Sequence, residues 1–421
     1  MNQGSSAADA ALLDEVQRAT FAYFWDFAHP TSGLARDRAH RDDDPGDQLI
    51  AIGGSGFGIM AIVVAVERGW ITRQAAVERL LVMTGFLQRA ERHHGIFPHF
   101  MDGGTGGVIR FSPADDGGDL VETAYLMQGL LTARQYFDRP DPGEAELRER
   151  VGQLWRETEW SWHTRGGESV LYWHWSPTVG WAMNHRIQGW NECLIAYVLA
   201  AGTTEHAIAP EVYHQGWAVG PEFRNGRSYY GVELPLGPAF GGPMFFAHYS
   251  FLGLDPRGLV DRYADYWTQN VAHTRINEAH CRANPNGFAG YGPECWGLTA
   301  SDNEAGYGAH DPANDRGVIT PSAAAASLPY APEAAMRAMR HFRHTLGDRL
   351  WGRYGFRDAF NQSRGWYATS YLAIDQGPIV CMIENHRSGL LWRLFMAVPE
   401  VRRGLQRLGF TSPALSGGGV A

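Results

Sequence analysis

Apolar residues recur at helical spacing along most of the chain. Between residues 10 and 28, Leu13, Val16, Phe21 and Phe24 are separated by polar and charged residues, which predicts an amphipathic helix. The same pattern predicts further helices at residues 72–92, 119–136, 144–159, 192–201, 257–282, 331–346, 377–396 and 399–408. Most of the chain is therefore expected to be helical.

Long irregular loops separate alternate pairs of these helices, and strand candidates such as 229–234 are scattered. About eleven or twelve paired helices with loops on one side predict an all-α fold, an (α/α)6 barrel of inner and outer helices whose long loops form a cleft at one end. No repeat of 20 to 50 residues is present, which excludes a solenoid. We expect one barrel domain over residues 10–410, with a flexible N-terminus at 1–9 and a flexible tail at 411–421.

A run of glycines, Gly53-Gly-Ser-Gly-Phe-Gly58, stands directly before an apolar segment. It matches neither the G-x-G-x-x-G fingerprint nor the Walker motif, and the strand expected before such motifs is weak. We interpret these glycines as positions where two backbones pack closely.

Composition excludes several classes of function. The net charge is -9 and no basic cluster offsets it, which argues against nucleic acid as a partner. The chain has no lysine, since all 36 basic residues are arginine, so Schiff-base, pyridoxal and P-loop chemistry are excluded. No cofactor is expected, and the negative net charge favours an uncharged ligand.

The four cysteines, Cys193, Cys281, Cys295 and Cys381, lack C-x-x-C spacing, so no metal is predicted. A bridge between Cys281 and Cys295 and four free thiols are both compatible with the spacing. The first fourteen residues have neither a basic nor an apolar region of a signal peptide, and the longest apolar run is too short to cross a bilayer. The sequence thus predicts a cytoplasmic protein that does not bind membranes, or a periplasmic one if a leader has been removed.

Candidate chemistry is densest between residues 115 and 122. Asp115, Asp116, Asp119 and Glu122 lie within eight residues at the start of a predicted helix. Asp119 and Glu122 also form a good capping box, which is the plain structural explanation. One cap needs one acid, however, and the additional charges repel one another unless they are used. We therefore take Asp115, Asp119 and Glu122 as candidate catalytic residues.

Tryptophan crowds residues 155–190, and a carboxylate follows directly. Rings in a polar cleft can stack on sugars, although any one of them can equally fill core. Glu192 begins the next predicted helix, where apolar neighbours would raise its pKa and the helix dipole would lower it. Glu192 is therefore a candidate general acid. The candidate binding residues are Arg38, Trp173, Trp175, Trp190, Asn191, Tyr291, Trp296 and Glu384.

Several motifs resemble those of glycoamylase-like proteins of glycoside hydrolase family 144. They are Asp115-Asp-Gly-Gly-Asp-Leu-Val-Glu-Thr123, Trp190-Asn-Glu192, Phe240-Gly-Gly-Pro-Met-Phe-Phe-Ala-His-Tyr249, Gly290-Tyr-Gly, Trp296-Gly-Leu-Thr-Ala-Ser-Asp302, Asp375-Gln-Gly-Pro-Ile-Val380 and Met382-Ile-Glu-Asn385. The resemblance implies an (α/α)6 barrel and an inverting hydrolase of β-1,2-glucan or its oligosaccharides that is endo- or exo-acting, and we expect endo action. It also implies that the essential acids are Asp115, Asp119, Glu122 and Glu192, and that an export signal is common.

Hydrolysis of a glycoside uses two carboxyl groups, one as acid and one as base or nucleophile. We assign Glu192 as acid and Asp119 with Glu122, supported by Asp115, as the base side; the reverse assignment stays open. Other classes also stay open: a transglycosylase, a hydrolase of another β-glucan, a non-catalytic glycan-binding protein, and a lyase or epimerase.

Overall fold

The computed structural model describes residues 3–416, and helices dominate it. The α-helices are α1 Gln3–Asp26, α2 Ile52–Glu67, α3 Arg73–Leu87, α4 Leu120–Tyr136, α5 Pro142–Arg156, α6 Leu194–Gly202, α7 Tyr266–Ala283, α8 Pro321–Ala326, α9 Pro332–Arg340, α10 Gly347–Leu350, α11 Ala373–Arg387, α12 Leu390–Ala397, α13 Pro399–Arg407 and α14 Pro413–Ser416. No helix in this part of the chain is long and apolar enough to cross a membrane.

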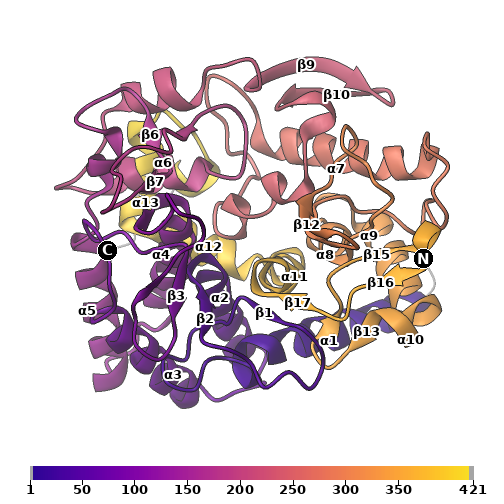
Figure 1. The fold of residues 1–421 in the computed structure, drawn as a ribbon, viewed down its shortest axis with the longest axis horizontal. Coiled ribbons are helices and arrows are strands. Elements are labelled where there is room, and N and C mark those ends of the chain that lie inside the picture. Colours follow the sequence, from indigo (N-terminus) through magenta and orange to yellow (C-terminus); the bar gives the residue numbers. More distant parts are fainter. Residues whose placement is uncertain (1–2, 417–421) are drawn as a thin grey trace.

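The helices form two rings. Figure 1 looks down the barrel, with α11 seen end-on near the centre and α1, α3 and α5 at the rim. The inner ring consists of α2, α4, α6, α8, α11 and the short 3-10 turns at 244–252, while α1, α3, α5, α7, α9 and a π-helical turn at 212–217 lie outside. The chain alternates between the rings, so the expected (α/α)6 barrel is confirmed.

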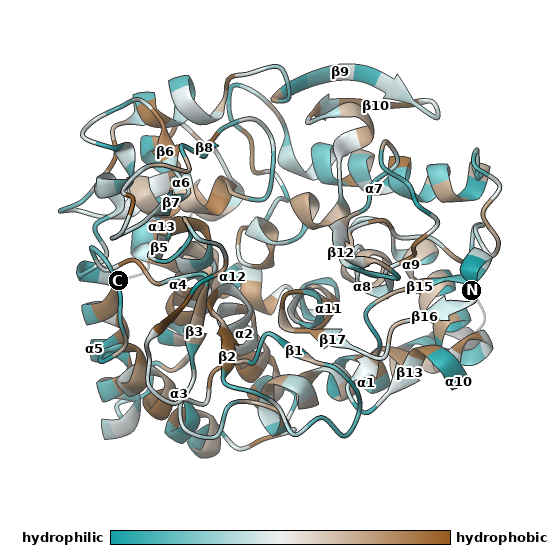
Figure 2. Cartoon of the chain, viewed as in Figure 1, coloured by the Kyte–Doolittle hydropathy of each residue, from teal (hydrophilic) through white to brown (hydrophobic). Residues whose placement is uncertain are grey.

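Burial explains which helices lie inside. Almost every side chain of α2, α4 and α6 is buried, whereas α3, α5 and α9 bury one face only. A helix that is apolar all round is stable only when other helices surround it, and an amphipathic one fits the rim. Figure 2 shows the apolar residues gathered toward the inner helices.

The glycine run lies inside α2 and lets it approach α4. A Cβ at Gly56 would clash with the carbonyl oxygen of Tyr125, and one at Gly129 would clash with that of Gly56. Close backbone packing was the interpretation of these glycines, and the structure confirms it. The contact fixes the start of α4 against the start of α2.

Short strands lie within the loops, and they do not form one continuous sheet in the described chain. They are β1 Arg38–Ala39, β2 Leu49–Ala51, β3 Phe100–Asp102, β4 Val108–Ile109, β5 Gly118–Asp119, β6 Leu171–Tyr172, β7 His174–Trp175, β8 Arg186–Ile187, β9 Arg224–Tyr229, β10 Val232–Leu236, β11 Ala300–Asn303, β12 Gly306–Ala309, β13 Trp351–Gly352, β14 Gly355–Phe356, β15 Phe360–Asn361, β16 Trp366–Tyr367 and β17 Tyr371–Leu372. They form antiparallel two-stranded sheets, and β2, β3 and β4 form one three-stranded sheet. Three pairs position the site: β1 with β17, β5 with β7, and β11 with β12.

Two expected boundaries are wrong. The helix predicted at 377–396 is two helices, α11 and α12, because Gly389 has a φ of 68° and starts a new direction. The helix predicted from residue 257 begins only at Tyr266, where Asp265 caps it by accepting from the Thr268 N–H at 2.7 Å.

Parts of both termini that were expected to be flexible are bound to the barrel. The Nε of Arg340 donates to Asp9 at 2.8 Å, and the N–H of Thr411 donates to the Val260 carbonyl at 2.7 Å. Residues 1–2 and 417–421 of the expected flexible ends lie outside the described residues. All four cysteines are free and buried, so Cys281 and Cys295 are not bridged.

Candidate active site

Inner helices begin at one end of the barrel, and their first turns meet there. The N–H of Gly53 at the start of α2 donates to Glu122 Oε2 in the first turn of α4 at 2.6 Å. Ser322 in α8 donates to Asp375 Oδ1 in the first turn of α11 at 3.0 Å. Helix N-termini carry partial positive charge that stabilises carboxylates. The arrangement therefore concentrates acids at this end.

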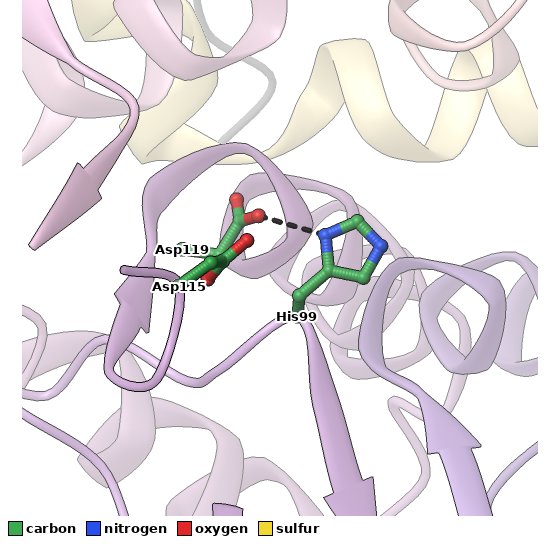
Figure 3. A group of neighbouring side chains, drawn as sticks. All are labelled: His99, Asp115 and Asp119. Atoms are coloured by element: carbon green, nitrogen blue, oxygen red, sulfur yellow. Dashed lines mark hydrogen bonds and ion pairs between the residues drawn. The ribbon is translucent and has the colours of Figure 1, made fainter. Parts of the chain in front are cut away.

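The first carboxyl centre is built around Asp119, the N-cap of α4. Its Oδ1 accepts from the N–H groups of Val121 and Glu122 at 2.9 and 3.0 Å. Its Oδ2 lies 3.0 Å from Nδ1 of His99, as Figure 3 shows. Asp119 therefore caps the helix, as the plain explanation of the motif predicted, and also holds a histidine. Only the Asp119 half of the expected capping box forms, because the Asp119 N–H donates to the Phe97 carbonyl and Glu122 accepts from Gly53 instead.

Strand pairing brings a second histidine to this centre. Asp119 of β5 is opposite His174 of β7, whose Nδ1 lies 3.3 Å from Asp115 Oδ2 and 3.6 Å from Asp119 Oδ2. Burial alone would lower the pKa of His99, but Glu122, Asp119 and Asp115 raise it to about 9. The pKa of Asp119 is lowered despite its burial, because His174 and His99 stabilise its charge. His99 thus carries a proton that balances the acids, and Asp119 and Asp115 raise the pKa of His174 in the same direction against its burial.

Three of these residues could bind a cation. His99, Asp115 and Asp119 place ligand atoms within 4.8 Å of one another. The same atoms are already balanced by protonated histidine, so a metal ion would have to displace those protons. The geometry admits a cation, but the local charge balance does not require one.

Glu192 joins this centre from the turn just before α6. Burial, and after it the charges of Glu122 and Asp119, raises its pKa to about 7. Its carbonyl accepts from Ser250 Oγ at 2.5 Å, which anchors the loop just before the helix. Burial raises the pKa of Glu122 to about 7 as well. The structure therefore brings together all four acids chosen from the sequence, at 115, 119, 122 and 192.

A second carboxyl centre was not identified from the sequence. Asp358 Oδ2 accepts from the Asp302 N–H at 2.7 Å, and buried Asp375 lies beside it in the first turn of α11. Burial raises the pKa of Asp358 well above its usual range and that of Asp375 to about 7. Arg38 holds Asp302 through two bonds of 3.1 and 3.2 Å. Two buried carboxyls side by side share a proton, which leaves one charge.

Tyr249 links the two centres. Besides burial, the charges of Asp375, Glu192 and Glu122 all raise the pKa of its phenol. Its ring lies 5.6 Å from that of Tyr125, whose hydroxyl contacts the Glu192 carbonyl at 3.4 Å. Acids of both carboxyl centres therefore lie within electrostatic reach of the Tyr249 phenol at this end of the barrel.

Some predicted binding residues lie at this end. Arg38 borders the second centre, and Trp173 and Trp175 flank His174 in the loop beside Asp119. Trp173 stacks on His185, with centroids 4.9 Å apart, and both tryptophans are partly exposed. Asn191 is partly exposed beside Glu192, where its Oδ1 accepts from the Cys193 N–H at 2.9 Å.

Other predicted binding residues are placed elsewhere. Trp190 and Trp296 are 2% and 0% exposed, so their rings fill core and cannot be sugar platforms. Glu384 is 0% exposed and forms a bidentate pair with Arg68 at 2.7 and 2.9 Å, which makes it structural. Tyr291 donates at 2.7 Å to Asp315, which is an acid of neither carboxyl centre.

A local signal for Asp375 was present in the sequence. It stands in the first turn of a helix that follows an apolar segment, as Asp119, Glu122 and Glu192 do near their helices. This shared pattern, an acid at the N-terminus of an inner helix, indicates Asp375 as a candidate. Asp358 and Asp302 lie in loops and have no such pattern.

Fold and site together define a class, a double-ring helical barrel with two carboxyl centres at the N-terminal end of its inner helices. Comparisons with known proteins agree. Residues 184–399 match the glycoamylase family model, described as "Putative glucoamylase", and the chain belongs to this family.

Three relatives illustrate the similarity. The structure of an endo-β-1,2-glucanase from Chitinophaga pinensis, with sophorotriose and glucose, is 50% identical with a TM-score of 0.94, covering 97% of this chain and 99% of that one. A Bacteroides uniformis protein with the same description as the family is 57% identical with a TM-score of 0.94, covering 97% and 98%. An exo-β-1,2-glucooligosaccharide sophorohydrolase (non-reducing end) from Parabacteroides distasonis is 46% identical over 95% of this chain. The chain spans only 58% of that relative's length.

Proposed function

We propose that the chain is a glycoside hydrolase that cleaves the β-1,2-glucosidic linkages of β-1,2-glucan or its oligosaccharides. The observation that carries the proposal is that two acids with raised pKa values, the partly exposed Glu192 and Asp375 of the second carboxyl centre, both act on the Tyr249 phenol. Similarity to an endo-β-1,2-glucanase over 99% of that chain supports the substrate class.

Glu192 is the general acid in this proposal. Its pKa of about 7 keeps a large fraction protonated near neutral pH, ready to protonate the leaving oxygen. An ionised, hydrogen-bonded carboxylate such as Asp119 is unsuited to that step, because its charge is stabilised by His174 and His99.

The base is better placed at Asp375 than at Asp119 and Glu122, where the sequence suggested it. Asp119 is 0% exposed and both its oxygens are occupied by the helix cap and His99, so it has no free lone pair aimed at a water. Asp375 accepts from Ser322 and shares a proton with Asp358, and among the described residues no helix cap or histidine holds its charge as they hold that of Asp119. Asp115, Asp119 and Glu122 then bind or orient sugar hydroxyls beside the acid.

We propose inversion and endo action. A separate base that activates water on the face opposite the acid gives inversion. Incubation with β-1,2-, β-1,3- and β-1,4-glucans tests the activity: we expect only the first to be cut, into α-anomeric products of mixed length at early times. β-Anomers or longer products would indicate a retaining enzyme or a transglycosylase, a disaccharide alone would indicate exo action, and binding without products a glycan-binding protein.

The pH profile should follow the two buried acids. Above about pH 7, Glu192 loses the proton that it must donate, and below about pH 7, Asp375 gains the proton that it must not hold. We expect kcat/KM to peak near neutrality and to fall about tenfold for each pH unit on either side. Rates measured from pH 5 to 9 with one oligosaccharide check this, and a flat profile between pH 6 and 9 would contradict it.

Metal removal should not reduce the rate. His99 and His174 already balance Asp115 and Asp119, so no cation is needed to hold them together. We expect dialysis against a chelator to leave kcat within about twofold of its starting value. A lost rate that Zn²⁺ or Ca²⁺ restores would show that the His99 centre binds an essential metal.

A further inference from the structure

Tyr307 stands on the β11–β12 hairpin, beside the second carboxyl centre. Strand register places it directly opposite Asp302. Side chains of directly opposed residues lie on the same face of a hairpin, with Cβ atoms about 5 Å apart. Tyr307 therefore projects on the face of the hairpin that carries Asp302.

That face is fixed in place by bonds to neighbouring loops. Asp302 binds Arg38 of β1 at 3.1 Å and accepts from Ser370 Oγ at 2.6 Å, and its own N–H donates to Asp358 at 2.7 Å. Because β1 and β17 are themselves paired, the hairpin is tied to the start of α11, where Asp375 lies. The position of Tyr307 relative to the acids is therefore set by the fold.

Tyr307 is exposed, and its phenol lies within electrostatic reach of the second carboxyl centre. The residue is 53% exposed, an unusual exposure for a large aromatic side chain that is not at a chain end. Desolvation of the phenol, and then the charges of Asp375 and Asp358, raises its pKa well above its usual range. Among the described residues the hydroxyl has no hydrogen-bond partner. It is a protonated donor near carboxylates, and no protein group uses it.

We propose that Tyr307 forms the wall of a sugar subsite over the Asp358–Asp375 pair, with its ring against a pyranose face and its hydroxyl available to a sugar oxygen. Tyr307 is a positioning residue in this proposal, and the proposal rests on the proposed function. The apolar C–H groups of a glucose face pack on a flat ring, and the exposed ring offers that surface next to the proposed base. No sequence motif drew attention to this residue.

The proposal is tested with Y307F, Y307L and Y307S, and with Y230L as control. Tyr230 is also an exposed tyrosine, 44% accessible, at the end of the β9–β10 hairpin, and its hydroxyl contacts His280 instead of an acid pair. The kcat and KM of each variant are measured on β-1,2-linked oligosaccharides of defined length, and thermal unfolding checks the fold.

We expect Y307L and Y307S to raise KM about tenfold with kcat within about twofold, because stacking acts on substrate and transition state alike. Y307F should stay within about threefold of the wild type, and Y230L should keep the wild-type KM. An unchanged KM in folded Y307L and Y307S, or a loss of kcat alone, overturns the proposal while leaving the hydrolase intact. A wild type that leaves β-1,2-glucans uncut overturns the proposed function and this inference with it.

Discussion

Replacing Glu192 by Gln should reduce the hydrolysis of β-1,2-glucan by about 10³-fold while the barrel stays folded. The amide has the shape of the protonated acid but has no proton to give to the leaving oxygen, and general acid catalysis contributes about 10² to 10⁴. The change also removes a partly buried group whose ionised form is disfavoured by burial and by Glu122. The fold should therefore not be weakened.

Glu205→Gln is the matched control. Glu205 is exposed just beyond the other end of α6, so the same chemical change is made far from the site. We expect wild-type kcat/KM from Glu205→Gln, and undiminished binding of oligosaccharide by Glu192→Gln in calorimetry. Substantial turnover by Glu192→Gln would remove Glu192 from the acid role. A substrate with a good leaving group, such as an aryl glycoside, should recover much of the lost rate if the role is correct.

The barrel and one side of the site were predictable because their signals are local. Helical spacing shows which residues share a face, and the Asp119-to-Glu122 capping box shows where α4 begins. The hydrogen bonds from Val121 and Glu122 to Asp119 follow from that box alone. Local chemistry thus located the acids of the first centre, but not His99 and His174, which the fold brings to them.

In the second centre only Asp375 has such a local signal, because the centre itself forms by convergence. Asp302, Asp358 and Asp375 come from a hairpin, a loop and a helix start, and only the fold brings them together. Glu384 was chosen from the same helix as Asp375, but it lies nine residues later, about 13 Å along the axis and on the opposite face. A motif indicates a segment, whereas tertiary structure decides which of its acids meets the site.

Tryptophan burial is a second limit of the sequence. Trp173 and Trp190 occur in the same aromatic stretch, yet Trp173 is partly exposed beside His174 and Trp190 packs against Trp217 and Tyr266. Both environments suit a large amphipathic ring, so residue type does not distinguish a platform from core. Whether a ring is exposed depends on the residues that pack against it, and these come from remote parts of the chain.

Replacing Asp375 by Asn should reduce turnover by about 10²- to 10⁴-fold and identifies which centre supplies the base. Asn can still accept from Ser322, as Asp375 does at 3.0 Å, but it cannot accept the proton of an attacking water. The folded-state pKa of Asp375 is raised to about 7, so its charged form destabilises the fold at higher pH. The unfolding temperature of the variant at pH 8 should therefore be no lower than that of the wild type.

Comparison with Asp119→Asn separates the two assignments. If Asp375 is the base, azide should restore turnover of Asp375→Asn by attacking in place of water and giving an α-glycosyl azide from a β-linked substrate. Asp119→Asn should instead lower thermal stability, because it weakens the cap of α4 and the bond to His99, and azide should not rescue it. Asp348→Asn, at an exposed position in α10, is the neutral control. Rescue of Asp119→Asn and not of Asp375→Asn would return the base to the first carboxyl centre.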